Sequence, residues 1–240
     1  MLSPSSPPIR YPRNPTRAFI AVCEHNTLCE AKRFYNKYKS DINLARNNYG
    51  VFSHTCRSGN QLTSEWLLQL APETNIRCEA DALFQNACRR GHFQMAKWLL
   101  RVCPGIDIFA RDEWAFRHAC LFGDLKFVQW LWGTMQFVRE RDNLAPIDRA
   151  PQNNLAFQYA CEKGHLPVAR WLVKTCPGID AHVDNDAVFR NSCFHGKVTS
   201  AKWLLATFPG INVRAEDDFA AKYAQINGHT RITQWLDQIC

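Results

Sequence analysis

An internal repeat constrains the fold of this chain more than any other feature. A phenylalanine precedes a cysteine by four residues six times, and successive pairs lie 33, 32, 32, 41 and 32 residues apart. A tryptophan recurs with steps of 32, 32, 41, 32 and 32 residues. Two columns that share a period predict a stack of similar repeats, each in contact with its neighbours. The columns are Phe19, Phe52, Phe84, Phe116, Phe157 and Phe189; Cys23, Cys56, Cys88, Cys120, Cys161 and Cys193; and Trp66, Trp98, Trp130, Trp171, Trp203 and Trp235.

The spacing inside one repeat predicts a pair of short helices. Phe84, Ala87 and Cys88 fall on one face of a first helix, which Gly91 ends. Residues 95–102 then carry a second apolar stripe, and a Pro-Gly pair follows it and stops the helix. Each repeat is therefore expected to read helix, turn, helix, loop. We expect the six column phenylalanines, cysteines and tryptophans to form the core.

The junctions between repeats have two notable features. Acidic residues such as Asp81, Asp112 and Asp186 stand where a first helix should begin, so we expect them to be N-caps. The single step of 41 residues locates a nine-residue insertion in the polar stretch 139–154.

Two of these patterns resemble the ankyrin repeat family. The segments Gly91-His-Phe-Gln-Met-Ala-Lys-Trp-Leu-Leu, Gly164-His-Leu-Pro-Val-Ala-Arg-Trp-Leu-Val and Gly228-His-Thr-Arg-Ile-Thr-Gln-Trp-Leu look like the ankyrin second helix. The segments Pro104-Gly-Ile-Asp-Ile, Pro177-Gly-Ile-Asp-Ala and Pro209-Gly-Ile-Asn-Val look like the ankyrin loop. The Thr-Pro-Leu-His opening of ankyrin repeats is replaced by an Ala-Phe-x-x-Ala-Cys pattern. This variety is similar to arrays of large amoeba-infecting DNA viruses and of some protists.

The resemblance implies an all-α fold, an ankyrin-repeat solenoid of about seven helix-turn-helix-loop units. Residues 1–16 contain many of the chain's prolines and serines and are predicted to be a disordered tail. The repeat domain is expected to cover residues 17–240. Its repeats are predicted at 17–47, 48–79, 80–111, 112–152, 153–184, 185–216 and 217–240.

Composition excludes several other classes of protein. No apolar run reaches the roughly 18 residues that span a bilayer, and the N-terminus has no apolar segment of a secretory signal. We therefore expect no membrane contact and a cytoplasmic protein, in the host cytoplasm if it is viral, with the nucleus as the alternative. The net charge is +7, but residues 1–46 carry +5 of it, so nucleic-acid binding along the repeats is disfavoured.

The cysteines and histidines predict no chemistry. Equivalent cysteines in stacked helices lie about 8 to 10 Å apart, too far for disulfides or for a zinc site, so we interpret them as small core residues. His92, His165 and His229 follow the turn glycine, where a polar turn residue suffices. No catalytic motif or phosphate-binding loop is present. We predict no enzyme activity, no metal and no cofactor.

A stack of repeats presents a long face, so we predict a non-catalytic module, a monomer that binds a protein partner and serves as a scaffold or adaptor. The resemblance implies that the partner meets the loop tips and the exposed side of the first helices. The expected partner-binding residues are Arg111, Trp114, Arg117, His118, Leu121, Gln158, Tyr159, Glu162, His182, Asp184, Arg190, Asn191 and Phe194.

Two alternatives remain open. The N-terminal tail could recruit further machinery, as in an adaptor, or the basic first repeat could bind a nucleic acid or another acidic partner. Two tryptophans lie outside the column: Trp132 is expected to extend a second helix into the seam between repeats. Trp114 is either a binding anchor or a loop-packing residue.

Overall fold

The computed structural model of the chain describes residues 14–25, 27–42, 44–72, 79–144, 150–176 and 178–239. Within these ranges all regular structure is helical, with 14 helices and no strand, which confirms the predicted all-α class. The helices are α1 (Pro15–His25), α2 (Leu28–Tyr38), α3 (Leu44–Ser58), α4 (Gln61–Leu70), α5 (Ala80–Arg89), α6 (Phe93–Val102), α7 (Ala110–Phe122), α8 (Leu125–Arg141), α9 (Ala150–Lys163), α10 (Leu166–Thr175), α11 (Val183–Phe194), α12 (Val198–Thr207), α13 (Ala215–Ile226) and α14 (Thr230–Ile239). The predicted tail falls outside the described residues up to residue 13, and α1 begins at Pro15.

The chain forms two compact units. The N-terminal unit ends at Ile106, and the C-terminal unit begins at Asp107 and also includes Cys88–Gly91. In the N-terminal unit α1 packs on α2 and α3, and α4 packs on α2, α3 and α6. The ring of Phe19 lies 6.2 Å from both Phe34 and Trp66, between centroids, so aromatic residues of two repeats share one core.

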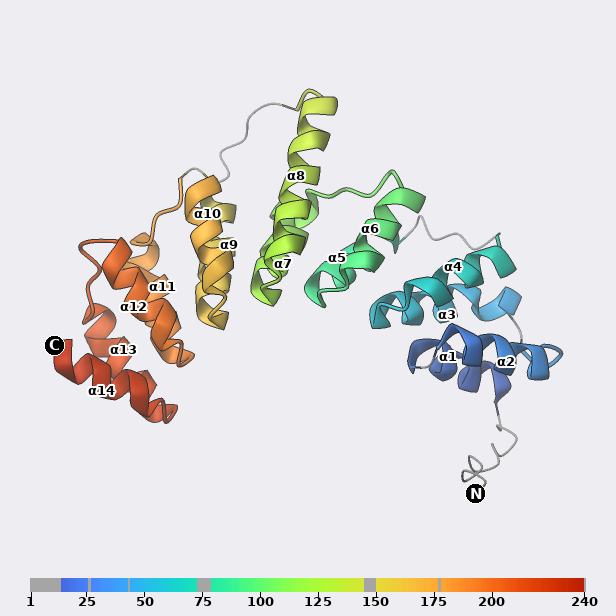
Figure 1. The fold of residues 1–240 in the computed structure, drawn as a ribbon, viewed down its shortest axis with the longest axis horizontal. Helices are drawn as coiled ribbons and strands as arrows, with labels where there is room; N and C mark the ends of the chain where they lie inside the picture. Colours follow the sequence, from blue (N-terminus) through green and yellow to red (C-terminus); the bar gives the residue numbers. More distant parts are fainter. Residues whose placement is uncertain are drawn as a thin grey trace, which may run out of the picture. The chain divides into compact units, whose positions relative to one another are not determined.

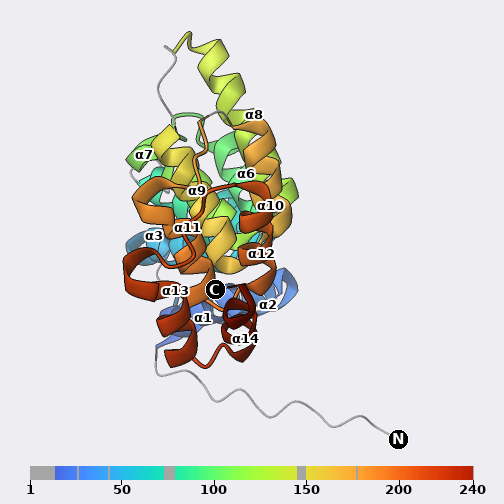
Figure 2. The ribbon, with the colours of Figure 1, turned by 90° about the vertical axis from the view of Figure 1, so that its left-hand side faces the viewer.

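The C-terminal unit arranges its helices in pairs (Figure 1). The first helix of each pair packs on the first helix of the next, so that α9 contacts α7 and α11, and α11 contacts α13. Figure 2 shows α7, α11 and α13 on one side of this unit and α8, α10 and α12 on the other. The first helices therefore form one continuous row, which positions the candidate site.

The phenylalanine and cysteine columns form the core as predicted. All six phenylalanines and all six cysteines are at most 1% exposed. The tryptophan prediction was partly wrong, because only Trp98 is fully buried and the other five are half-buried. Several tryptophans lie with one face against a core phenylalanine of the preceding repeat, such as Trp203 at 6.1 Å from Phe157 and Trp235 at 6.4 Å from Phe189. They cover the core as a seam between repeats.

The insertion lies partly in helix rather than in a loop. Most second helices have 10 residues, whereas α8 has 17 and continues to Arg141. Met135, in the added segment, is fully buried, so apolar packing supports the longer helix. Trp132 packs 5.3 Å from Phe116 and 6.1 Å from Trp171, which confirms its predicted place in the seam. Residues 145–149 lie outside the described ranges.

Across the described ranges, no helix is both long enough and apolar enough to cross a lipid bilayer.

Candidate functional site

The first helices α7, α11 and α13 each begin with a left-handed turn. Three consecutive residues in each have φ between 54° and 60°, namely residues 111–113, 184–186 and 216–218. Left-handed backbone costs roughly 1 to 2 kcal/mol per residue, and least for Asp and Asn, which these turns use repeatedly. The predicted N-caps at Asp112 and Asp186 were therefore wrong, because both residues lie inside a turn whose backbone runs left-handed.

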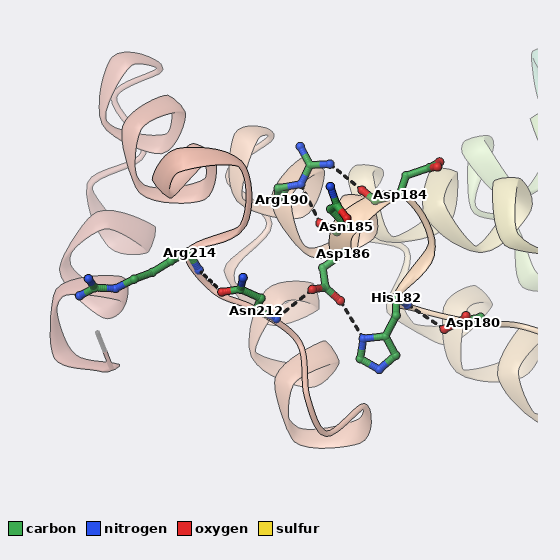
Figure 3. Close-up of polar contacts among 8 residues, drawn as sticks. All are labelled: Asp180, His182, Asp184, Asn185, Asp186, Arg190, Asn212 and Arg214. Atoms are coloured by element: carbon green, nitrogen blue, oxygen red, sulfur yellow. Dashed lines mark hydrogen bonds and ion pairs between the residues drawn. The ribbon is translucent and has the colours of Figure 1, made fainter.

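An arginine of the same helix holds two of these turns. The Arg117 Nη2 donates to the carbonyl of Arg111 at 2.9 Å. In the equivalent position, Arg190 donates from Nη2 to the carbonyl of Asp184 at 2.7 Å and from Nε to that of Asn185 at 3.0 Å (Figure 3). The two arginines predicted to meet a partner are thus occupied in fixing the backbone of the loop tips.

The carboxylate of Asp186 links two repeats (Figure 3). It is 6% exposed, and its Oδ1 lies 2.8 Å from Nδ1 of His182. Its Oδ2 accepts a hydrogen bond from the backbone N–H of Asn212, in the loop of the next repeat, at 2.9 Å. The Asn212 side chain then accepts from the N–H of Arg214 at 3.0 Å, which shapes the loop that enters α13. Asp186 therefore fixes the loop tips rather than capping a helix.

Aromatic side chains occupy the outer side of α7 and α9. The Trp114 and His118 rings stack at 3.6 Å between centroids, and the Tyr159 ring meets His118 edge-on at 5.9 Å. The Nδ1 of His118 lies 3.0 Å from the carbonyl of Trp114. Burial, with the charges of Arg117 and Arg89, lowers the pKa of His118 below 6.5, so the ring is neutral near pH 7. Trp114 therefore packs on its own helix and stays partly exposed.

Polar side chains continue the surface onto α11. The carboxylate Oε1 of Glu162 accepts from Gln158 on its own helix at 2.9 Å and from Asn191 on α11 at 2.7 Å. A charge-assisted bond between neighbouring helices fixes all three side chains in half-buried positions.

A second aromatic group follows on α11 and α13. Phe194 lies 6.2 Å from Phe219 and 5.9 Å from Tyr223, and Phe219 and Tyr223 are 4.2 Å apart. The guanidinium of Arg190 lies 5.2 Å from the Phe219 ring. Phe219 and Tyr223 were missed from the sequence because the last repeat reads as a polar cap, although Phe219 stands one position beyond the usual start of the helical stripe.

We define the first-helix row by its side chains, which are Trp114, His118, Gln158, Tyr159, Glu162, Asn191, Phe194, Phe219 and Tyr223. The structure brings together seven of the 13 predicted residues in this row. Arg117 and Arg190 hold turns beside it, and Arg111 and Asp184 supply the carbonyls that they bind. His182 faces Asp186, and the Leu121 carbonyl accepts from Nε2 of His165 at 3.1 Å.

The turn histidines have a more specific role than predicted. The Nε2 atoms of His92, His165 and His229 lie 2.9 to 3.1 Å from carbonyl oxygens of the preceding repeat. Asn60, which replaces histidine in the second repeat, donates to the carbonyl of Cys23 at 3.1 Å. Each turn residue thus joins its repeat to the previous one.

The cysteine column is chemically quiet. The described cysteines are free thiols, and burial raises the pKa of Cys23, Cys56 and Cys193 to about 12. No group of three or more potential metal ligands occurs among the residues that the structure describes. Cys78 and Cys240 lie outside those residues. A neutral, buried thiol is a poor nucleophile, which fits a packing role for the column.

A scan against models of protein families finds no match to this chain, and a search of curated proteins finds no relative.

Proposed function

We propose that this chain is a non-catalytic protein-binding module of the ankyrin type and that its partner lies along the first-helix row. The paired helices, the buried phenylalanine and cysteine columns and the bridging turn histidines support a stack of like repeats. Such stacks commonly use the side formed by their first helices for recognition.

One observation carries the proposal. The row continues over four helices, α7, α9, α11 and α13, and its side chains are held by contacts with one another rather than by the core. Ordered side chains lose little entropy on binding, and Trp and Tyr are the types that contribute most at protein interfaces. The alternation of aromatic rings with the Glu162 group fits a partner surface that offers apolar side chains and hydrogen-bond donors.

The test compares two double variants of the full chain. Trp114→Ala with Tyr159→Ala removes two rings of the row, whereas Phe137→Ala with Leu144→Ala removes two exposed apolar side chains at and beyond the end of α8. Quantitative affinity capture from the natural cell, followed by binding measurements with each purified candidate, gives the readout. We expect at least a tenfold loss of affinity with the first variant, unchanged affinity with the second, and little change in melting temperature for either.

The opposite result is simple to recognise. If every captured protein binds both double variants as tightly as it binds the original chain, the partner does not lie on the first-helix row.

A further inference from the structure

A cavity of about 710 Å³ opens at the helix-turn-helix corners of three successive repeats in the C-terminal unit. The corner between α9 and α10 contributes Lys163 and Gly164, and the corner between α11 and α12 contributes Gly196 and Lys197. The corner between α13 and α14 contributes residues 228–232. This volume lies within the roughly 300 to 1,000 Å³ typical of small-molecule sites.

The wall of the cavity is positively charged. Each of the three corners contributes one cation, and these are Lys163, Lys197 and Arg231, while no carboxylate is among the lining residues. In the described part of the chain none of the three forms an ion pair. Three cations without counter-charges would therefore be stabilised by an anionic ligand.

The corners also supply hydrogen-bond donors. The hydroxyl-bearing residues Thr199 and Thr230 line the cavity, and both lie in the first turns of their helices, α12 and α14. The positive ends of these two helix dipoles add to the charge of the three side chains.

Neighbouring histidines report the same positive field. The pKa of His165 is lowered by burial and then by the charges of Lys197 and Lys163. The same two lysines act on His195, whose pKa is also lowered, first by burial. Glu162 is the carboxylate that opposes them at His195, and it is already bonded to Gln158 and Asn191.

We propose that this cavity binds a small molecule that carries several phosphate groups. Equivalent positions on stacked helices are about 8 to 10 Å apart, so one phosphate cannot contact the cations of all three corners. Linked phosphates match both the spacing and the number of charges. This site involves the corners of the repeats rather than the first-helix row, so it stands independently of the proposed function.

Calorimetric titration of the full chain tests the site, with tripolyphosphate, orthophosphate and citrate as probes at constant ionic strength. The cavity variant is Lys163→Gln, Lys197→Gln, Arg231→Gln. The control is Lys126→Gln, Lys174→Gln, Lys222→Gln, which removes the same charge from exposed lysines of the same unit that do not line the cavity. Far-UV circular dichroism verifies folding, and the single variant Lys197→Gln serves if the triple variant does not fold.

We expect tripolyphosphate to bind at least tenfold more tightly than orthophosphate or citrate. The cavity variant should lose at least tenfold in affinity, Lys197→Gln alone at least threefold, and the control less than twofold. Absence of tripolyphosphate binding at millimolar concentration, equal binding of citrate, or equal losses in the cavity and control variants would each overturn the proposal.

Discussion

Replacing Gly123 by alanine should break one of the joints between repeats. Gly123 follows α7 with φ of +92°, and a Cβ atom there would overlap the ring of His165 from the next repeat. Left-handed backbone costs alanine roughly 1 to 2 kcal/mol. Moving the ring also loses its hydrogen bond to the Leu121 carbonyl, which contributes about 0.5 to 1.5 kcal/mol. We therefore expect Gly123→Ala to lower the free energy of unfolding by about 2 to 3 kcal/mol.

Urea unfolding followed by circular dichroism measures this loss, and Gly228→Ala is the matched control. Gly228 has φ of +71°, but nothing lies within 4 Å of a Cβ built there, so only the backbone cost remains. The double variant Gly123→Ala with His165→Ala removes the overlap and should recover part of the stability. Equal losses for Gly123→Ala and Gly228→Ala, or no coupling between Gly123 and His165, would refute the argument that the ring is what makes glycine necessary.

Two further predictions concern charge. Asp186→Asn should lower the free energy of unfolding by about 1 to 2 kcal/mol and speed hydrogen exchange at the Asn212 amide, because the bond that this amide makes to the buried carboxylate weakens; Asp184→Asn, at an exposed side chain of the same turn, is the control, and equal exchange rates in the two variants would contradict the bridge. The pKa values of His118, His165 and His195 are lowered on folding, so the unfolded chain binds more protons just below pH 6.5 and stability should fall as the pH drops from 6.5 through the folded-state values. Urea unfolding at pH 7.5 and 5.5 measures the fall, and His165→Asn should reduce it; an unaltered pH dependence in that variant would count against the assignment.

The helix pairs could be predicted from the sequence because their signal is local and repeated. Phe84, Ala87 and Cys88 recur at the same spacing in other repeats, and burial of one face explains both the period and the residue types. The length of α8 could not be predicted in this way. Met135 carries the needed apolar signal, but it stands in one repeat alone and has no column to support it.

The candidate site was only partly predictable for a different reason. Its exposed positions could be recognised as those that vary between repeats, which placed Tyr159, Asn191 and Phe194 correctly on the first helices. The left-handed turns were missed because an acidic residue before a helix is equally typical of an N-cap. The bonds of the turn histidines were missed because their acceptors are backbone carbonyls of another repeat, which no residue type marks.

The direction of the turn bonds bears on how the chain is assembled during synthesis. Asn60, His92, His165 and His229 each reach back to a carbonyl that was made earlier, and the Asn212 amide likewise reaches back to Asp186. A newly emerging repeat thus meets its acceptors already in place on the ribosome-proximal surface of its predecessor. We expect folding to advance within each unit from the N-terminal side, in step with translation.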